Sequence, residues 1–298
     1  MTTIPARLEG LSKTVKSALD HLVHCDAIYL NIPHVSRKGK KYVLPKDFLS
    51  DLTPEQQTKV ILNRCQDLGP ITKILPALEL ESDPNTLVIS LDDDIMFKKD
   101  ISQILLEKHR QYPDACVSFS GFCVGVFPFN WQFAISNKRD LECDWIQGVH
   151  SIVFPRGLID LESFKEWKPH MIKHDDHRIS SFLSSKGIRR ISINKSPIDY
   201  MYDNPDLKQT ESISGSTEFV LQNAKISFQF YCEELYNKNH LCLWFTSIIG
   251  LVVAGLALAS VTIYLNSCFK GHDIWFIIGF ALALTGMLYF VLTDSLIV

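Results

Sequence analysis

The chain has 298 residues, of which 46% are hydrophobic and 21% are charged, and its formal net charge is -3. This length allows one sizeable domain with an appendage or two small domains, and the slight negative charge offers no basic surface for nucleic acid. None of the eight cysteines belongs to a CxxC pair, which excludes a zinc ribbon or a thioredoxin-like motif. The opening residues MTTIP show no basic and then apolar leader, so no signal peptide is expected, and reduced thiols facing the cytosol are the simpler expectation.

Residues 1–205 carry apolar patterns that alternate between helical spacing and short continuous runs. The patterns predict helices over residues 8–22, 72–80, 101–110 and 178–186, and strands over residues 27–32, 59–62, 86–91 and 188–193. Alternation of this kind predicts an α/β domain whose mainly parallel sheet is flanked by helices. Ligands of such sheets bind beyond the carboxyl ends of the strands.

Two long apolar runs without charged residues occupy residues 241–265 and 274–292. Each reaches the roughly 20 residues that a helix needs to cross the bilayer core. The sequence therefore predicts a transmembrane helical hairpin over residues 241–298, with a pair of buried core helices as the alternative.

Residues 206–240 are expected to form a loop followed by a helix, over 219–236, that leads to the membrane. Lys225 and Lys238 precede the first span, whereas the loop between the spans balances Lys270 with Asp273. Because positively charged residues favour the cytoplasmic side, we expect the N-terminal domain to face the cytosol.

Three consecutive carboxylates, Asp92, Asp93 and Asp94, follow directly after the predicted strand 86–91. If strand geometry continues, Asp92 and Asp94 point to one side and Asp93 to the other. Two carboxylates at the end of a strand can hold a hard divalent cation, which would neutralise a diphosphate leaving group. The alternative is a solvated acidic turn before the next helix.

Two other segments have the composition of an anion-binding loop. Residues 2–7 (TTIPAR) precede the first helix, where backbone donors and an arginine can receive a nucleotide or phosphate. Residues 67–73 (DLGPITK) contain a Gly-Pro turn and end at Lys73, which can lie near an anionic ligand. The alternative for each is an ordinary loop with a helix cap.

The segment His174-Asp175-Asp176-His177 lies just before an amphipathic helix. An aspartate here can act as the general base for a sugar hydroxyl, and an ordinary pKa of about 3.9 would leave it ionised at neutral pH. One alternative is an acidic helix N-terminus. Another takes His174 and His177 as metal ligands.

Five ordered segments together resemble GT-A-fold glycosyltransferases, and most closely a small branch found in bacteria and large DNA viruses: TTIPAR, DLGPITK, LDDDI, WIQGVHSIVFP and HDDHRISSFLSSKG. The similarity covers residues 1–205 and leaves out the predicted hairpin. It implies a membrane-anchored transferase of the hexosyltransferase type, which moves a sugar from a nucleotide-sugar donor, UDP-sugar first among candidates, to a glycan or lipid-linked hydroxyl acceptor. It also implies Mn²⁺ or Mg²⁺ as cofactor and inversion at the transferred sugar.

The resemblance assigns donor-side roles in the first half of the chain. Thr3 and Arg7 match the loop against the donor nucleotide, and Asp67 and Lys73 match a second donor-side loop. Gly148 matches a loop near the transferred sugar and the acceptor.

The acidic segments receive the remaining roles. Asp92 corresponds to the carboxylate near the ribose and can also bind the metal, Asp94 corresponds to the metal ligand, and Asp93 is grouped with the donor-binding residues. Asp176 matches the catalytic base, with Asp175 as the other candidate because this chain has Asp-Asp where the family has Glu-Asp.

Two features depart from the family pattern. Related enzymes have several apolar residues before the TIP-like segment, so we expect a first strand that is shortened, or that lacks a few residues before Met1. A third protein ligand for the metal is not evident, although His150 and His170 are candidates and water and diphosphate oxygens would suffice. The competing functions are a catalytically inactive, glycosyltransferase-like membrane scaffold or glycan-binding protein, and a metal-dependent phosphohydrolase.

Overall fold

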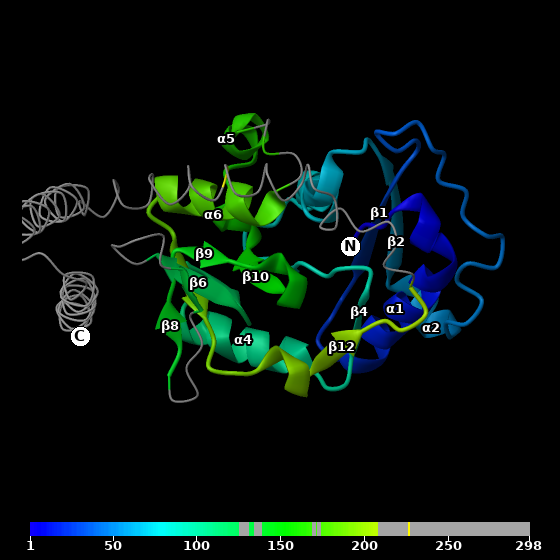
Figure 1. The fold of residues 1–298 in the computed structure, drawn as a ribbon. Coiled ribbons are helices and arrows are strands. Elements are labelled where there is room, and N and C mark those ends of the chain that lie inside the picture. The colour runs from blue at the N-terminus through cyan, green and yellow to red at the C-terminus, as the bar shows by residue number, and fades with distance from the viewer. Residues whose placement is uncertain (125–130, 134–138, 169–170, 172–173, 208–225, 227–298) are drawn as a thin grey trace, which may run out of the picture. The chain divides into compact units, whose positions relative to one another are not determined.

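The computed structural model describes residues 1–124, 131–133, 139–168, 171, 174–207 and 226 (Figure 1). They belong to one compact unit with a mixed α/β fold. The spans predicted at 241–265 and 274–292 lie outside the described residues, as does the helix 219–236 apart from Ile226. Within the described residues, no helix combines the length and the apolar character needed to cross a membrane.

The N-terminal part contains a short parallel sheet. Its strands β1 (Ile28–Pro33) and β2 (Val60–Cys65) pair in register from Ile28 with Val60 to Pro33 with Cys65. Before β1, the 3-10 helix η1 (Pro5–Arg7) leads into α1 (Leu8–His21), whose buried apolar face follows the helical spacing and belongs to the same hydrophobic core as β1. Thr53 caps the short helix α2 (Pro54–Thr58) that precedes β2.

Met1 occupies the position of a further parallel strand beside β1. Its amino group donates to Tyr29 O at 3.0 Å, and Asn31 N donates to Met1 O at 2.9 Å, which is the pattern of a parallel ladder. A cavity of about 390 Å³ lies between β1 and β3 (Leu87–Ile89), with Met1 in its lining. Met1 thus adds one residue of parallel pairing beside β1.

The larger sheet has five strands in the order β3, β10 (Ile152–Pro155), β5 (Ala115–Ser118), β11 (Arg189–Ser192) and β8 (Leu141–Glu142). Only the pairing of β11 with β5 is parallel in this sheet, because β10 is antiparallel to both β3 and β5, and β8 is antiparallel to β11. The sheet is therefore mixed, and the expectation of a mainly parallel sheet is wrong. The reason is that the described chain from β5 to β10 contains no α-helix, whereas parallel neighbours need a long crossover.

Two helices cover opposite faces of this sheet (Figure 1). Val117 of β5 packs in the cluster that contains Leu105 of α4 (Ile101–Gln111). Cys116, the residue before Val117 in the strand, packs in the cluster that contains Phe182 of α6 (Asp175–Ser185). Alternate side chains of one buried strand thus join two separate cores.

The remaining elements are short and surround the site. They are η2 (Gly69–Lys73), α3 (Leu75–Leu80), η3 (Gly148–His150), η4 (Arg156–Leu158), α5 (Leu161–Glu166) and η5 (Pro197–Asp199), together with the antiparallel pair β4 (Ile95–Phe97) and β12 (Met201–Asp203) and the antiparallel sheet of β7 (Trp131–Phe133), β6 (Gly121–Val124) and β9 (Trp145–Ile146). The predicted helices and strands have observed counterparts within a few residues, but no strand was predicted between α4 and α6. Those strands have only two to four residues, too few to show a clear period.

Candidate functional site

Lys73 joins two acidic segments that are far apart in the sequence. Its Nζ lies 2.9 Å from Asp92 Oδ1 and 2.9 Å from Asp175 Oδ2, and its side chain is 8% exposed. Burial disfavours the charged ammonium, but the carboxylates of Asp175, Asp92 and Asp176 outweigh burial and raise the pKa of Lys73 well above its ordinary value. Lys73 is therefore a permanently charged centre between the end of β3 and the start of α6.

Asp176 lies on the first turn of α6, where its Oδ1 accepts a hydrogen bond from Gly148 N at 2.9 Å. Burial, and then the neighbouring charge of Asp175, raise the pKa of Asp176 to about 7. The sequence interpretation assumed an ordinary pKa for this carboxylate, which is wrong because the tertiary fold removes water and adds a second carboxylate.

Gly148 leaves no space for a side chain. A Cβ atom at this position would lie 2.8 Å from Asp176 Oδ1 and 2.9 Å from Lys73 Nζ. The glycine therefore lets the backbone N–H approach the charged cluster directly.

Arg7 gathers the other two carboxylates. Its Nη1 lies 2.8 Å from Asp93 Oδ1 and 3.0 Å from Asp94 Oδ2, and the Thr3 hydroxyl donates to Asp93 Oδ2. Asp93 is buried, and burial raises its pKa to about 6 although the charge of Arg7 opposes the shift.

The expected alternation of the three aspartates does not occur. Asp93 and Asp94 both reach Arg7, whereas Asp92 turns to Lys73. Strand β3 ends at Ile89 and residues 93–94 form a turn, so period-two geometry does not apply to them. Asp93 holds the N-terminal segment against this turn, and its role is that of a structural brace.

The carboxylates of Asp92 and Asp94 were expected to hold a hard divalent cation. Each uses one oxygen in an ion pair, and the other oxygen, Asp92 Oδ2 or Asp94 Oδ1, accepts no hydrogen bond within the described residues. The side chains are 22% and 39% exposed, so these oxygens are accessible. No three His, Cys, Asp or Glu side chains of the described residues group as ligands, and phosphate or water oxygens would complete the coordination.

Asp67 does not join the charged cluster. Its Oδ1 accepts from Gly69 N at 2.8 Å and its Oδ2 accepts from Arg37 N at 2.9 Å. Gly69 has φ +74°, the left-handed conformation that the Gly-Pro turn was expected to need. Asp67 thus braces a loop, and it was selected as a donor-side residue only from the resemblance.

The histidines near the site are held by other contacts. The His177 ring lies 4.4 Å from the Trp145 ring, and burial lowers the pKa of His177 to about 4, so the ring is neutral at pH 7. His150 Nδ1 lies 2.8 Å from Ser120 Oγ, and the other histidine considered as a third metal ligand, His170, lies outside the described residues.

Three residues that support the aspartate turn were missed from the sequence. Thr14 donates its hydroxyl to Asp93 O at 2.7 Å, Asn204 donates its backbone N–H to Asp94 O, and Tyr42 donates its hydroxyl to Thr3 O. Thr14 lies three residues after Leu11 on the buried face of α1. A polar residue among the apolar residues of that face was the one sign in the sequence that could have pointed to Thr14. Tyr42 and Asn204 lie in segments without periodicity, and only the fold brings them to this turn.

The chain matches no family model, and no curated protein is significantly similar to it in sequence.

Proposed function

We propose that the chain is a membrane-anchored, metal-dependent glycosyltransferase with a GT-A-type domain. It transfers a sugar from a nucleotide-sugar, with UDP-sugar as the first candidate, to a hydroxyl acceptor on a glycan or lipid, with inversion. Mn²⁺ or Mg²⁺ is its metal, and the predicted hairpin keeps the domain beside membrane-bound acceptors on the cytosolic side.

The observation that carries this proposal is the double ion pair of Lys73. It connects the aspartate turn after β3 to the acidic first turn of α6, and Gly148 lies against the same cluster. Residues selected from three separate segments are thus in contact, as one donor and acceptor site requires.

Each residue of the cluster has a separate role in the proposed reaction. Asp92 and Asp94 would hold the cation, which supplies positive charge to stabilise the leaving diphosphate. Arg7 and Lys73 orient the donor-side carboxylates and add positive charge beside the phosphates. Asp176 accepts the proton of the attacking hydroxyl, and its pKa near 7 matches the requirement of a general base at neutral pH.

Calorimetric titration of the full chain in detergent with UDP, GDP and CDP, with and without Mn²⁺, tests the donor site. We expect one nucleotide to bind in a metal-dependent way, and we expect Asp94→Ala to lose the metal dependence. Asp206→Ala is the matched control, because Asp206 is an exposed acid that pairs with Lys13. Absence of nucleotide binding under every condition would contradict the proposal.

The competing function is a non-catalytic scaffold or glycan-binding protein. The observation in its favour is that Arg7 and Lys73 already neutralise the carboxylates that would hold the metal. A scaffold predicts glycan binding that is unchanged by Mn²⁺ and by Asp176→Asn. A transferase predicts that the same substitution abolishes sugar transfer.

A further inference from the structure

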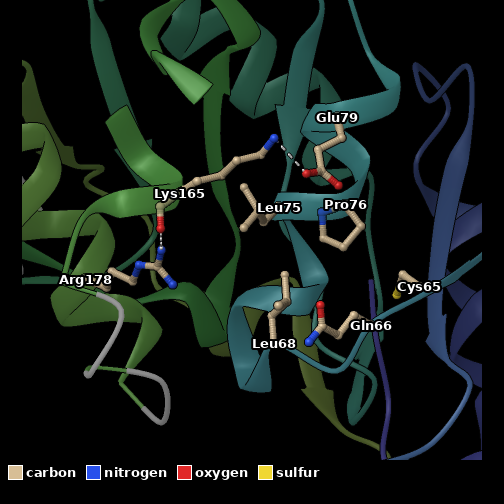
Figure 2. A pocket seen from close by; sticks show the side chains of 8 residues that line it. All are labelled: Cys65, Gln66, Leu68, Leu75, Pro76, Glu79, Lys165 and Arg178. Carbon is tan, nitrogen blue, oxygen red and sulfur yellow. Dashed lines mark hydrogen bonds and ion pairs between the residues drawn. The ribbon is translucent and has the colours of Figure 1, made fainter. Parts of the chain in front are cut away.

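A pocket with apolar and charged lining residues lies apart from the charged cluster. Its volume is about 300 Å³, and Figure 2 shows the side chains around it. They come from the end of β2, from the segment η2–α3 and from α5 and α6, and they are Cys65, Gln66, Leu68, Leu75, Pro76, Glu79, Lys165 and Arg178. None of them is a member of the Lys73 or Arg7 ion pairs.

Arg178 is a buried cation without a carboxylate partner. The residue is 4% exposed, and within the described residues its guanidinium forms no ion pair. Burial without a counter-charge lowers the pKa of Arg178. A guanidinium in this condition loses hydration without recovering the energy from an anion, which makes the position costly unless an anion binds there.

Part of the guanidinium already has a structural role. Nη2 donates to Phe164 O and to Lys165 O, both at 2.9 Å, and so caps the last turn of α5. Nη1 donates no hydrogen bond within the described residues, and Nε is buried without a partner. A cap alone therefore leaves two donor nitrogens of Arg178 unused.

Among the residues that line the pocket, two cations, Lys165 and Arg178, accompany one carboxylate, Glu79. Lys165 Nζ lies 3.0 Å from Glu79 Oε1 (Figure 2) and also 3.2 Å from Glu162 Oε1, which is not part of the lining, so the carboxylates near the pocket are paired with Lys165. Arg178 remains as the uncompensated charge. Leu68, Leu75 and Pro76 supply apolar wall around it.

We propose that this pocket binds an oxyanion, a phosphate or carboxylate group, at the guanidinium of Arg178, with any apolar part of the ligand against Leu68 and Leu75. Guanidinium donors suit planar and tetrahedral oxyanions because their geometry allows charge-assisted hydrogen bonds. The site does not depend on the proposed transferase activity, since it shares no residue with the charged cluster.

Alkylation of Cys65 in the full chain tests the site, because this thiol lines the pocket and gives a local readout. We expect inorganic phosphate to slow N-ethylmaleimide labelling of Cys65 saturably, relative to Cys25, which lies outside the pocket. Arg178→Gln should weaken the apparent affinity about tenfold or more, the loss of at least one charge-assisted contact. Lys13→Gln, at an exposed lysine outside the pocket, should leave it unchanged.

The oxyanion could come from a lipid headgroup or from a free phosphate. Vesicles that contain phosphatidic acid test the lipid headgroup, with vesicles of phosphatidylcholine alone as their control. Protection by phosphatidic acid vesicles but not by free phosphate would support the site and identify a lipid headgroup. Protection by neither probe, or equal protection in Arg178→Gln, would overturn the proposal. If Arg178→Gln fails to fold, Arg178→Lys, which keeps the charge but not the donor geometry of the guanidinium, decides the result: unchanged protection in that variant would overturn the proposal.

Discussion

Lys73 and Arg178 are both buried cations, yet their surroundings are opposite. Three carboxylates raise the pKa of Lys73, and two of them lie within ion-pair distance. Among the described residues, the guanidinium of Arg178 contacts the carbonyl groups of α5 and the face of Phe164, and no carboxylate. The cluster around Lys73 thus has an excess of carboxylates, whereas Arg178 has no carboxylate partner within the described residues. A bound cation would offset the charge at the first site, and a bound anion would offset it at the second.

The largest expected effect is a loss of stability on substitution of Lys73 that substitution of Arg178 does not cause. Lys73→Met should lower the free energy of unfolding by about 3–5 kcal/mol, because it leaves buried carboxylates without their cation. Arg178→Met should cost only about 1 kcal/mol, because the lost cap is offset by removal of an unpaired buried charge. Urea unfolding at neutral pH measures both. Equal losses in the two variants would contradict the comparison.

A smaller effect is expected at Gly148. The methyl group of Gly148→Ala would press on Asp176 Oδ1 and Lys73 Nζ, so we expect a loss of about 1–3 kcal/mol from overpacking and a reduced transfer rate. Gly39→Ala is a control for strain without crowding, because Gly39 has φ +77° and open space around its Cβ position. A Gly148→Ala variant as stable and as active as the wild type would contradict the close approach of this backbone to Asp176 and Lys73.

The last predicted stability effect comes from Asp176→Asn, and its sign is opposite. The native state keeps a proton on Asp176 up to a pKa of about 7, whereas an unfolded Asp loses it near 3.8. The native state thus binds more protons in this window, and the contribution of Asp176 to stability falls as pH rises from about 4 to about 7.

The shift from 3.8 to about 7 corresponds to about 4 kcal/mol, so Asp176→Asn should be more stable than the wild type at pH 8 by up to that amount and nearly equal to it at pH 4. Denaturation in EDTA at both pH values measures this, since a bound cation would itself change the titration. The variant should also lose sugar transfer. A stability difference that does not change with pH would show that Asp176 titrates normally.

Several elements could be predicted from local patterns. Helix α1 was evident from the spacing of Leu8, Leu11 and Val15, and the turn at Gly69 was evident from its Gly-Pro pair. The contact between Lys73 and Asp175 follows no pattern in the chain, because the two residues are brought together only when η2 and α6 pack on the same sheet. The membrane hairpin predicted over 241–298 stays a prediction, since it lies outside the described residues.

The amino-acid sequence by itself determined which residue types were available for chemistry: an aspartate triplet after a strand, an acidic first helical turn, and a glycine and a lysine in the loops between them. Only the tertiary structure decided how those charges are shared. It placed Asp93 with Arg7, Asp92 with Lys73, and Arg178 with no carboxylate in the described part of the chain. The physical reason is that helix and strand periods depend on neighbours in the chain, whereas pKa values and ion pairs depend on burial and on charges from distant segments.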